Sequence, residues 1–157
     1  MEEFEEKLKA GRDKIFVADH MLMTTYSLLK DPKILLSILD NISLAYESTL
    51  SAFLQYERLF RRISSYTPEA GSELNFFQLK VMNKYGIKED LIEPYVRIRD
   101  ILKAHKDSNI EFSRNGNYII ANDDYDLTKI SAEEIKKDIK SCKDFQALIE
   151  KKIKTLI

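Results

Sequence analysis

The sequence is poor in several residue types that mark common classes of protein. Its 157 residues include one cysteine, two histidines, four glycines, three prolines and no tryptophan. A single cysteine, Cys142, cannot form an internal disulfide and supplies no CxxC redox or metal signature. The four glycines are isolated, so the glycine-rich loops that hold phosphates or dinucleotides are absent. We therefore expect no nucleotide-binding fold, no metal and no cofactor.

Long hydrophobic runs and a strong net charge are also missing. The most apolar stretch, ILLSILDNISLAY, is interrupted by Asp40 and Asn41, and the first residues, MEEFEEKLKAG, are acidic where a signal peptide would be basic and then apolar. The formal net charge is −1, which gives no overall attraction to nucleic acid or anionic lipid. The sequence predicts a cytoplasmic protein without a membrane segment, in which any contact with RNA is local.

Apolar residues at steps of three and four predict a mainly α-helical protein. Such stripes favour helices over about 2–30, 31–62 and 72–85, another that carries the apolar residues of 91–105, and a last helix opened by a capping box of Ser131 and Glu134. Pro94 either kinks its helix or marks its first turn. We expect one domain over 1–157, an antiparallel bundle of four to five helices.

The helix over 31–62 has two apolar faces. Beside its main stripe lies a second set of apolar side chains, made of Leu39, Tyr46, Leu50, Phe53 and Phe60. Two faces need two sets of partners, and in a small domain one of them could meet a second subunit. This pattern favours a homodimer in which a monomer would leave part of the second face exposed.

Residues 110–121, IEFSRNGNYIIA, have the pattern of a β-hairpin, unlike the helical pattern of the rest of the chain. Asn115 and Gly116 form the strongest short hairpin signal, and β-forming residues flank them. A two-residue turn would give both turn residues positive φ and place Ser113 opposite Tyr118. It also puts one set of apolar side chains on a common face, which we expect to pack against the helices: Ile110, Phe112, Ile119 and Ala121.

Two other polar segments allow more than one interpretation. Residues 122–133 place oxygen ligands as in a calcium loop, but Leu127 stands where that loop needs glycine, so a polar loop leading to Ser131 is favoured. Arg58, Arg61 and Arg62 form a basic helix end, which is either solvated and favourable to the helix dipole or a contact for RNA phosphates.

The candidate catalytic segment is RIRDILKAH, residues 97–105. An imidazole such as that of His105 can relay a proton from a ribose hydroxyl, while the guanidinium of Arg99 can neutralise charge on a phosphorane transition state. Asp100 would orient a partner or contact substrate. Six residues along a helix separate two side chains by about 120° and roughly 9 Å, so convergence needs long side chains or a partner subunit.

This pattern resembles the HEPN family, the higher eukaryote and prokaryote nucleotide-binding domain. Many of its members are helical bundles that carry an arginine, a polar residue and then a histidine, as Arg99, Asp100 and His105 do. The resemblance implies a dimer with a cleft that cuts RNA without metal, often in toxin–antitoxin or defence systems. Asp107 replaces the tyrosine of members that are silenced by nucleotide transfer, so that form of control is not expected.

The sequence thus supports two functions from different classes. The first is a HEPN-like, metal-independent endoribonuclease or RNA-binding protein, with an antitoxin or other protein as a further partner. The alternative is a non-catalytic, dimeric helical protein that binds another protein, in which Arg99 and His105 are incidental. The first interpretation needs both side chains to open into one groove together with their symmetry mates in a dimer, whereas the alternative allows them to lie apart or to form salt bridges with Asp or Glu.

Overall fold

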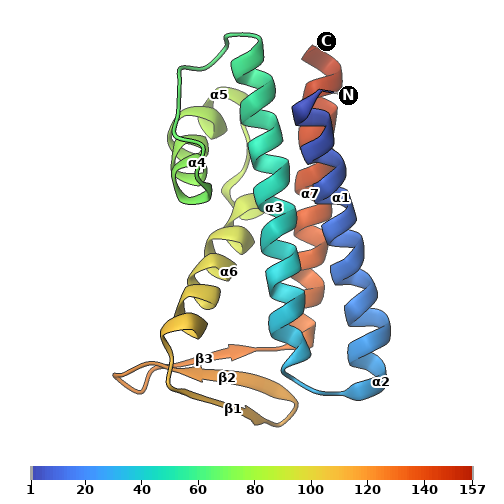
Figure 1. Ribbon diagram of the computed structural model, residues 1–157, viewed down its shortest axis with the longest axis vertical. Coiled ribbons are helices and arrows are strands. Elements are labelled where there is room, and N and C mark those ends of the chain that lie inside the picture. Colours follow the sequence, from blue (N-terminus) through green and yellow to red (C-terminus); the bar gives the residue numbers. More distant parts are fainter. Residues whose placement is uncertain (1, 157) are drawn as a thin grey trace.

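Four helices form an antiparallel bundle along the length of the molecule. The computed structural model describes residues 2–156, with the side chains of 2–154, and its long helices are α1 (Glu3–His20), α3 (Ile34–Leu59), α6 (Glu89–Asp107) and α7 (Ala132–Leu156). In Figure 1, α1, α3 and α7 run side by side and both ends of the chain lie at the top, while α6 covers only the lower half. The mainly helical fold predicted from the sequence is confirmed.

Shorter segments complete the helical part. The first predicted helix continues through the π-helical η1 (Met21–Tyr26) and α2 (Ser27–Leu29), and the third is built of α4 (Ala70–Phe76), η2 (Phe77–Val81) and α5 (Met82–Tyr85). Gly86 ends α5 with φ of 63°, a left-handed cap that favours glycine. Pro94 lies inside α6 rather than in its first turn. In Figure 1, α4 and α5 cover the upper part of α3 where α6 does not reach.

Both apolar faces of α3 are buried within the chain. Leu39, Tyr46, Leu50 and Phe53 are at most 1% exposed, and only Phe60, past the end of α3, is open to solvent. The reason is that α1 and α7 cover one side of α3, while α4 and α6 cover the other. The expectation that a monomer exposes this second face is therefore wrong, and these residues give no argument for a dimer.

A small antiparallel sheet closes the lower end of the bundle (Figure 1). The predicted hairpin is confirmed as β1 (Ile110–Arg114) and β2 (Asn117–Ala121), with Ser113 opposite Tyr118 and positive φ at both turn residues, Asn115 and Gly116. A third strand, β3 (Leu127–Ile130), pairs with β2 inside the stretch predicted to be a polar loop. Residues before β3 do form such a loop.

The face of the sheet that packs on the helices is not the predicted one. Tyr118, Ile120 and Ile130 point inward and join the main core. Ile110 and Phe112 lie on the opposite face and are 47% and 37% exposed, whereas Ile119 and Ala121 share that face but are only 7% and 4% exposed. The predicted packing of Ile110, Phe112, Ile119 and Ala121 against the helices is wrong, because β2 is apolar on both faces and its Tyr118 and Ile120, paired with Ser113 and Glu111, are the side chains that join the core.

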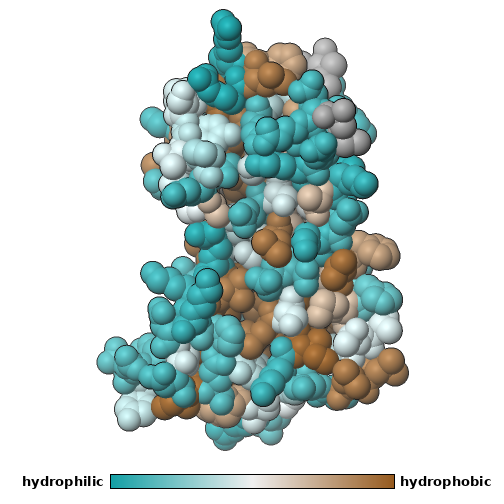
Figure 2. Space-filling model, viewed as in Figure 1, coloured by the Kyte–Doolittle hydropathy of each residue, from teal (hydrophilic) through white to brown (hydrophobic). Residues whose placement is uncertain are grey.

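Other apolar side chains are exposed at the end of α1. Figure 2 shows hydrophobic groups at the lower right, over the end of α1 and over α2. The most exposed large apolar side chains of α1, η1 and α2 are Phe16, Met23, Leu28 and Leu29. Within residues 2–156, no helix is both long enough and apolar enough to cross a membrane.

Candidate functional site at the junction of helix α6 and the sheet

His105 lies in the last turn of α6 and contacts a side chain of β1, the first strand of the sheet. Its Nδ1 is 2.7 Å from Oε2 of Glu111 in β1. The other carboxylate oxygen, Oε1, accepts a hydrogen bond of 2.6 Å from the hydroxyl of Tyr118 in β2. The three side chains form one hydrogen-bonded chain, here called the His105–Glu111–Tyr118 chain, which joins α6 to the inner face of the sheet.

The chemistry of these groups fixes the direction of each hydrogen bond. Burial, followed by the bond to Glu111, raises the pKa of Tyr118 to about 12, so its hydroxyl remains a donor at neutral pH. An ionised carboxylate only accepts, so the close contact with Glu111 requires a hydrogen on Nδ1 of His105. The neutral imidazole then carries its free lone pair on Nε2, and the side chain of His105 is 40% exposed to solvent. A carboxylate that orients a histidine in this way leaves Nε2 available as a base.

Arg99 does not lie in the same place as His105. Its guanidinium carbon lies 5.7 Å from the ring centre of Tyr95, one turn back towards the start of α6. A Cβ atom on Gly71 would be 3.3 Å from Nη2 of Arg99, so the guanidinium also packs against the start of α4. Burial raises the pKa of Tyr95 to about 12, and Arg99 acts in the opposite direction. Arg99 thus reaches along α6 in the direction opposite to His105.

Asp100 does not contact the His105–Glu111–Tyr118 chain. It is exposed on α6, and the structure gives its carboxylate no hydrogen bond or ion pair among the side chains of residues 2–154. Within one chain, therefore, the three residues selected from the sequence do not converge. Two residues that the sequence analysis did not select, Glu111 and Tyr118, contact His105 directly or through one bond. The available signal was Glu111 itself, a carboxylate in a β-forming segment six residues after the histidine.

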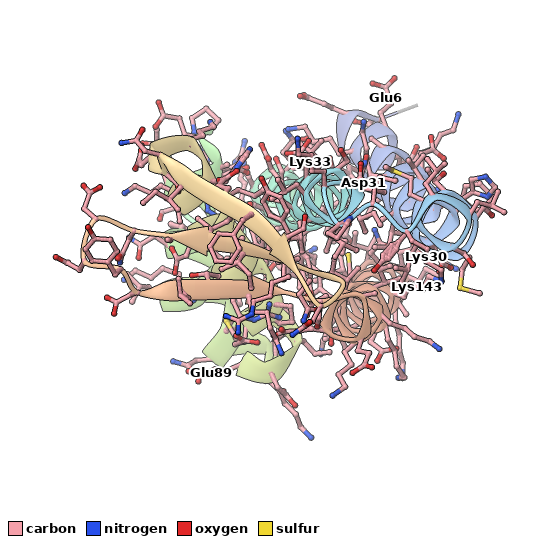
Figure 3. All side chains as sticks on the ribbon, turned by 90° about the horizontal axis from the view of Figure 1, so that it is seen from below. Glu6, Lys30, Asp31, Lys33, Glu89 and Lys143 are labelled. Atoms are coloured by element: carbon pink, nitrogen blue, oxygen red, sulfur yellow. The ribbon has the colours of Figure 1, made fainter. Side chains whose placement is uncertain are left out.

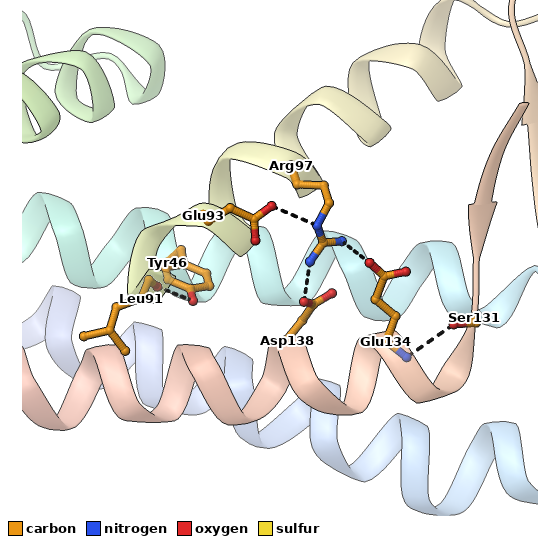
Figure 4. A network of polar contacts seen from close by, with 7 residues as sticks. All are labelled: Tyr46, Leu91, Glu93, Arg97, Ser131, Glu134 and Asp138. Atoms are coloured by element: carbon orange, nitrogen blue, oxygen red, sulfur yellow. Dashed lines mark hydrogen bonds and ion pairs between the residues drawn. The ribbon is translucent and has the colours of Figure 1, made fainter. Parts of the chain in front are cut away.

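A second arginine of α6 carries the strongest ion pairs of the region (Figure 4). Arg97 contacts Glu93 at 3.2 Å, Glu134 at 3.3 Å and Asp138 at 2.5 Å, and thereby ties α6 to α7. Burial raises the pKa of Asp138 to about 6, although Arg97 lowers it. The spacing of Glu93 and Arg97 on one helix face is visible in the sequence, whereas their contacts with α7 depend on the packing of two helices.

The three arginines at and just after the end of α3 do not form one basic surface. Arg62 bonds the buried Glu57 at 2.6 Å and lies over the rings of Tyr56 and Phe60. Arg58 donates to Ser65 and lines a hollow of about 300 Å³ together with the acidic Glu2 and Glu3. Arg61 is exposed. Arg58, Arg61 and Arg62 thus have separate surroundings, of which those of Arg58 and Arg62 are partly acidic.

The remaining polar candidates have local surroundings. The side-chain oxygen of Asn122 accepts the amides of Asp124 and Asp126 at 3.0 and 2.8 Å, so it is used within its own loop. His20 stacks on Phe16, and Cys142 is buried with its pKa raised by that burial. Over the described part of the chain, no group of three or more histidine, cysteine, aspartate or glutamate side chains is arranged to hold a metal ion.

The chain was compared with family models, with curated proteins and with solved structures, and none of them matches it. The fold and the site define a mainly helical bundle that carries a small sheet at one end. Its most distinctive polar feature is the His105–Glu111–Tyr118 chain at the junction of α6 and that sheet.

Proposed function

We propose that this protein is a HEPN-like RNA-binding protein with metal-independent endoribonuclease chemistry centred on His105. The observation that carries the proposal is the His105–Glu111–Tyr118 chain, in which Nδ1 of the partly exposed His105 lies 2.7 Å from a carboxylate oxygen, so that donation from Nδ1 would leave Nε2 as the base. Many general bases in enzymes are histidines that are oriented by a carboxylate in this manner. The HEPN resemblance of Arg99, Asp100 and His105 agrees with the substrate class.

The proposed reaction uses the RNA's own hydroxyl as nucleophile. Nε2 of His105 takes the proton of a ribose 2′-hydroxyl, and the 2′ oxygen attacks the adjacent phosphorus. The bond from phosphorus to the 5′ oxygen breaks, and that oxygen leaves with a proton delivered by the imidazolium or by water. The products are one fragment with a 2′,3′-cyclic phosphate and one with a 5′-hydroxyl. Glu111 stabilises the imidazolium that forms during the proton transfer.

Arg99 receives a different role from the one expected from the sequence. Because it lies about 9 Å from His105 along the helix and extends away from it, it is suited to a neighbouring phosphate rather than to the phosphate that is cut. A contact with a neighbouring phosphate strengthens binding of substrate and transition state alike. The proposal therefore assigns proton transfer to His105 and RNA binding to Arg99.

The test is cleavage of single-stranded RNA by purified protein in the presence of a chelator. His105→Ala should lower the rate roughly a hundredfold or more, as is typical of general acid–base groups, and cyclic phosphate ends should appear in the wild-type reaction only. Arg99→Ala should raise KM more than it lowers kcat. His20→Ala is the matched control, since His20 is also an exposed helical histidine, and it should leave the rate unchanged. Equal cleavage by wild-type and His105→Ala protein would indicate a contaminating nuclease.

A second candidate function is a non-catalytic helical protein that acts by binding other proteins. It is favoured by a specific observation: Arg99 and His105 each contact another element of the same chain, α4 and β1 respectively, and lie apart. In this case the His105–Glu111–Tyr118 chain serves only to hold the sheet on α6. His105→Ala would then lower the free energy of unfolding, and neither protein would cleave any RNA tested.

A further inference from the structure

A hollow opens on the side of the bundle where α1 and α7 separate. Along α1, Arg12 pairs with Glu150 at 2.5 Å and Asp19 pairs with Lys143 at 2.6 Å, and the two pairs are equally spaced on both helices. Beyond α1 the chain enters the π-helical η1, which packs mainly on α3. This change leaves a space of about 620 Å³ beside α7, lined by Asp19, Glu133, Lys136, Lys137, Ile139, Lys140 and Lys143.

The wall of this hollow is mostly apolar, although four of the lining residues are lysines. Ile139 lies at its base and is only 4% exposed. A lysine side chain has a long hydrocarbon stem, which can cover apolar surface while its ammonium group stays in water. A molecule in the hollow therefore meets carbon on the inside and positive charge at the rim.

Two of the four lysines, Lys136 and Lys137, have no anionic partner. Among the side chains of residues 2–154, the structure gives them neither an ion pair nor a hydrogen bond. Lys140 and Lys143 are each paired with a carboxylate, at 3.1 and 2.6 Å. Available positive charge beside an apolar wall favours a ligand that has an anionic group and an apolar body.

The two carboxylates of the lining restrict the kind of anion. Asp19 and Glu133 would repel a polyanion such as RNA, whose successive phosphates cannot all lie beside lysines. A single anionic group next to Lys136 and Lys137 avoids this repulsion. Inorganic phosphate alone would leave the apolar wall in contact with water, so it gains nothing from most of the hollow.

We propose that the hollow between α1 and α7 binds a single-chain amphiphile with a carboxylate head, such as a fatty acid. The head lies between the ammonium groups of Lys136 and Lys137, and the chain lies against Ile139 and the lysine stems towards Lys143. From Glu133 to Lys143 the lining extends over about 15 Å of α7, which suits a chain of medium length. The volume lies within the range of roughly 300–1,000 Å³ that is usual for small-molecule sites.

This site lies on the side of α7 that faces away from α6. Glu134 and Asp138 contact α6, and two positions along a helix turn a side chain by about 200°, so Lys136 and Lys140 point the other way. Figure 3, which views the molecule from below, shows Lys143 on the side of α7 that faces α1. The inference therefore goes beyond the proposed function and does not depend on RNA cleavage.

The first test is calorimetric titration of the wild-type protein with decanoate below its micelle-forming concentration. We expect saturable binding at one site. Butyrate keeps the head but lacks the long chain, and decyltrimethylammonium keeps the chain but has a cationic head, so each should bind at least about tenfold more weakly. No binding of decanoate, or equally strong binding of either control compound, would overturn the proposal.

The second test changes the two lysines without a partner. Lys136→Glu/Lys137→Glu should weaken the binding of decanoate roughly tenfold or more, with an unchanged helical circular dichroism spectrum. Lys9→Glu/Lys14→Glu is the matched control, because it makes the same change in net charge at two exposed lysines of α1. This control should bind like the wild type. Equal losses in both variants would mean that net charge alone attracts the ligand, which contradicts a site in the hollow.

A third measurement distinguishes a free amphiphile from a membrane. Vesicles that contain phosphatidylglycerol should leave the wild-type protein in the supernatant after sedimentation, because the proposed ligand enters the hollow as a single molecule. Co-sedimentation that is lost in Lys136→Glu/Lys137→Glu, without any binding of decanoate, would make the surface a membrane contact and the proposal wrong. Decanoate binding is measured without RNA, so a protein that cleaves no RNA but binds decanoate would contradict only the ribonuclease proposal.

Discussion

Asp138 shows how burial changes the behaviour of one residue. Its side chain is almost fully buried between α6 and α7, and one carboxylate oxygen, Oδ2, has no hydrogen-bond partner. Arg97 contacts the other oxygen at 2.5 Å, but this attraction does not offset the loss of water around the charge, and the pKa rises to about 6. The protonated form of Asp138 is therefore favoured by folding.

This shift predicts how stability depends on pH. Between about 4 and 6 the folded state holds a proton on Asp138 that the unfolded state releases, so stability contributed by this group falls as pH rises through that window. Asp138→Asn cannot titrate there. The difference in free energy of unfolding between wild type and Asp138→Asn should shift by about 2 kcal/mol in favour of the wild type on going from pH 7 to pH 4.5. Urea denaturation at the two pH values measures it, and a constant difference would contradict the assignment.

Arg97 and Arg99 show that neighbouring residues of one type can differ entirely in their contacts. Two positions along a helix turn a side chain by about 200°. Arg97 therefore faces α7 and its carboxylates, whereas Arg99 lies over Tyr95 beside α4. The sequence motif selects Arg99, but the ion pairs that hold the helices together belong to Arg97.

Helix α1 approaches α3 closely at Gly11. A Cβ atom added there would lie 2.6 Å from Oγ1 of Thr49 and 3.1 Å from the carbonyl oxygen of Ala45, at the contact of α1 with α3. Thr49 is itself buried and donates to the Ala45 carbonyl, while Gln146 of α7 donates to the same hydroxyl. Three helices thus meet where α1 has no side chain.

We expect Gly11→Ala to destabilise the fold. The added methyl group must displace either Thr49 or the backbone of α3, and such overpacking typically costs about 1–3 kcal/mol. Gly71→Ala is the control, since its added Cβ would meet only the flexible end of Arg99 at 3.3 Å on an exposed part of α4. It should be neutral or slightly stabilising, because alanine is the better helix former. Thermal unfolding of both variants checks the prediction, which is wrong if Gly11→Ala unfolds at the wild-type temperature.

At the scale of the whole molecule, the α4–α5 segment is tied to the bundle by a buried charge. Glu57 at the end of α3 is fully buried, and its carboxylate accepts hydrogen bonds from Tyr85 of α5 and from Arg62. Lys84 adds a longer contact of 3.9 Å. This cluster joins the end of α3 and the turn that follows it to α5, which lies 28 residues further along the chain.

Removal of Arg62 should therefore destabilise the protein. Arg62→Ala leaves the buried carboxylate of Glu57 without its closest cation, which should cost roughly 3 kcal/mol. Arg61→Ala, one residue earlier on the exposed surface, should change the free energy of unfolding by less than about 0.5 kcal/mol. Chemical denaturation of the two variants makes the comparison. Similar effects of both substitutions would mean that the Glu57 cluster does not stabilise the fold.

Elements that depend on local chemistry follow from the amino-acid pattern alone. The helices follow from steps of three and four, and the turn at Asn115 and Gly116 follows from the preference of these residues for positive φ. Ser131 caps α7 as predicted, accepting the amide of Glu134 at 3.3 Å. His105 was selected as a candidate on the same local grounds.

Which surfaces are covered and which side chains meet depends on tertiary packing. Strand β2 is apolar on both faces, so alternation along it does not by itself choose Tyr118 and Ile120 as the inner face. The burial of both apolar faces of α3, the pairing of His105 with Glu111 and the direction of Arg99 likewise depend on neighbours supplied by other elements. Periodicity specifies the faces of one element, whereas contacts between elements depend on how their faces pack in three dimensions.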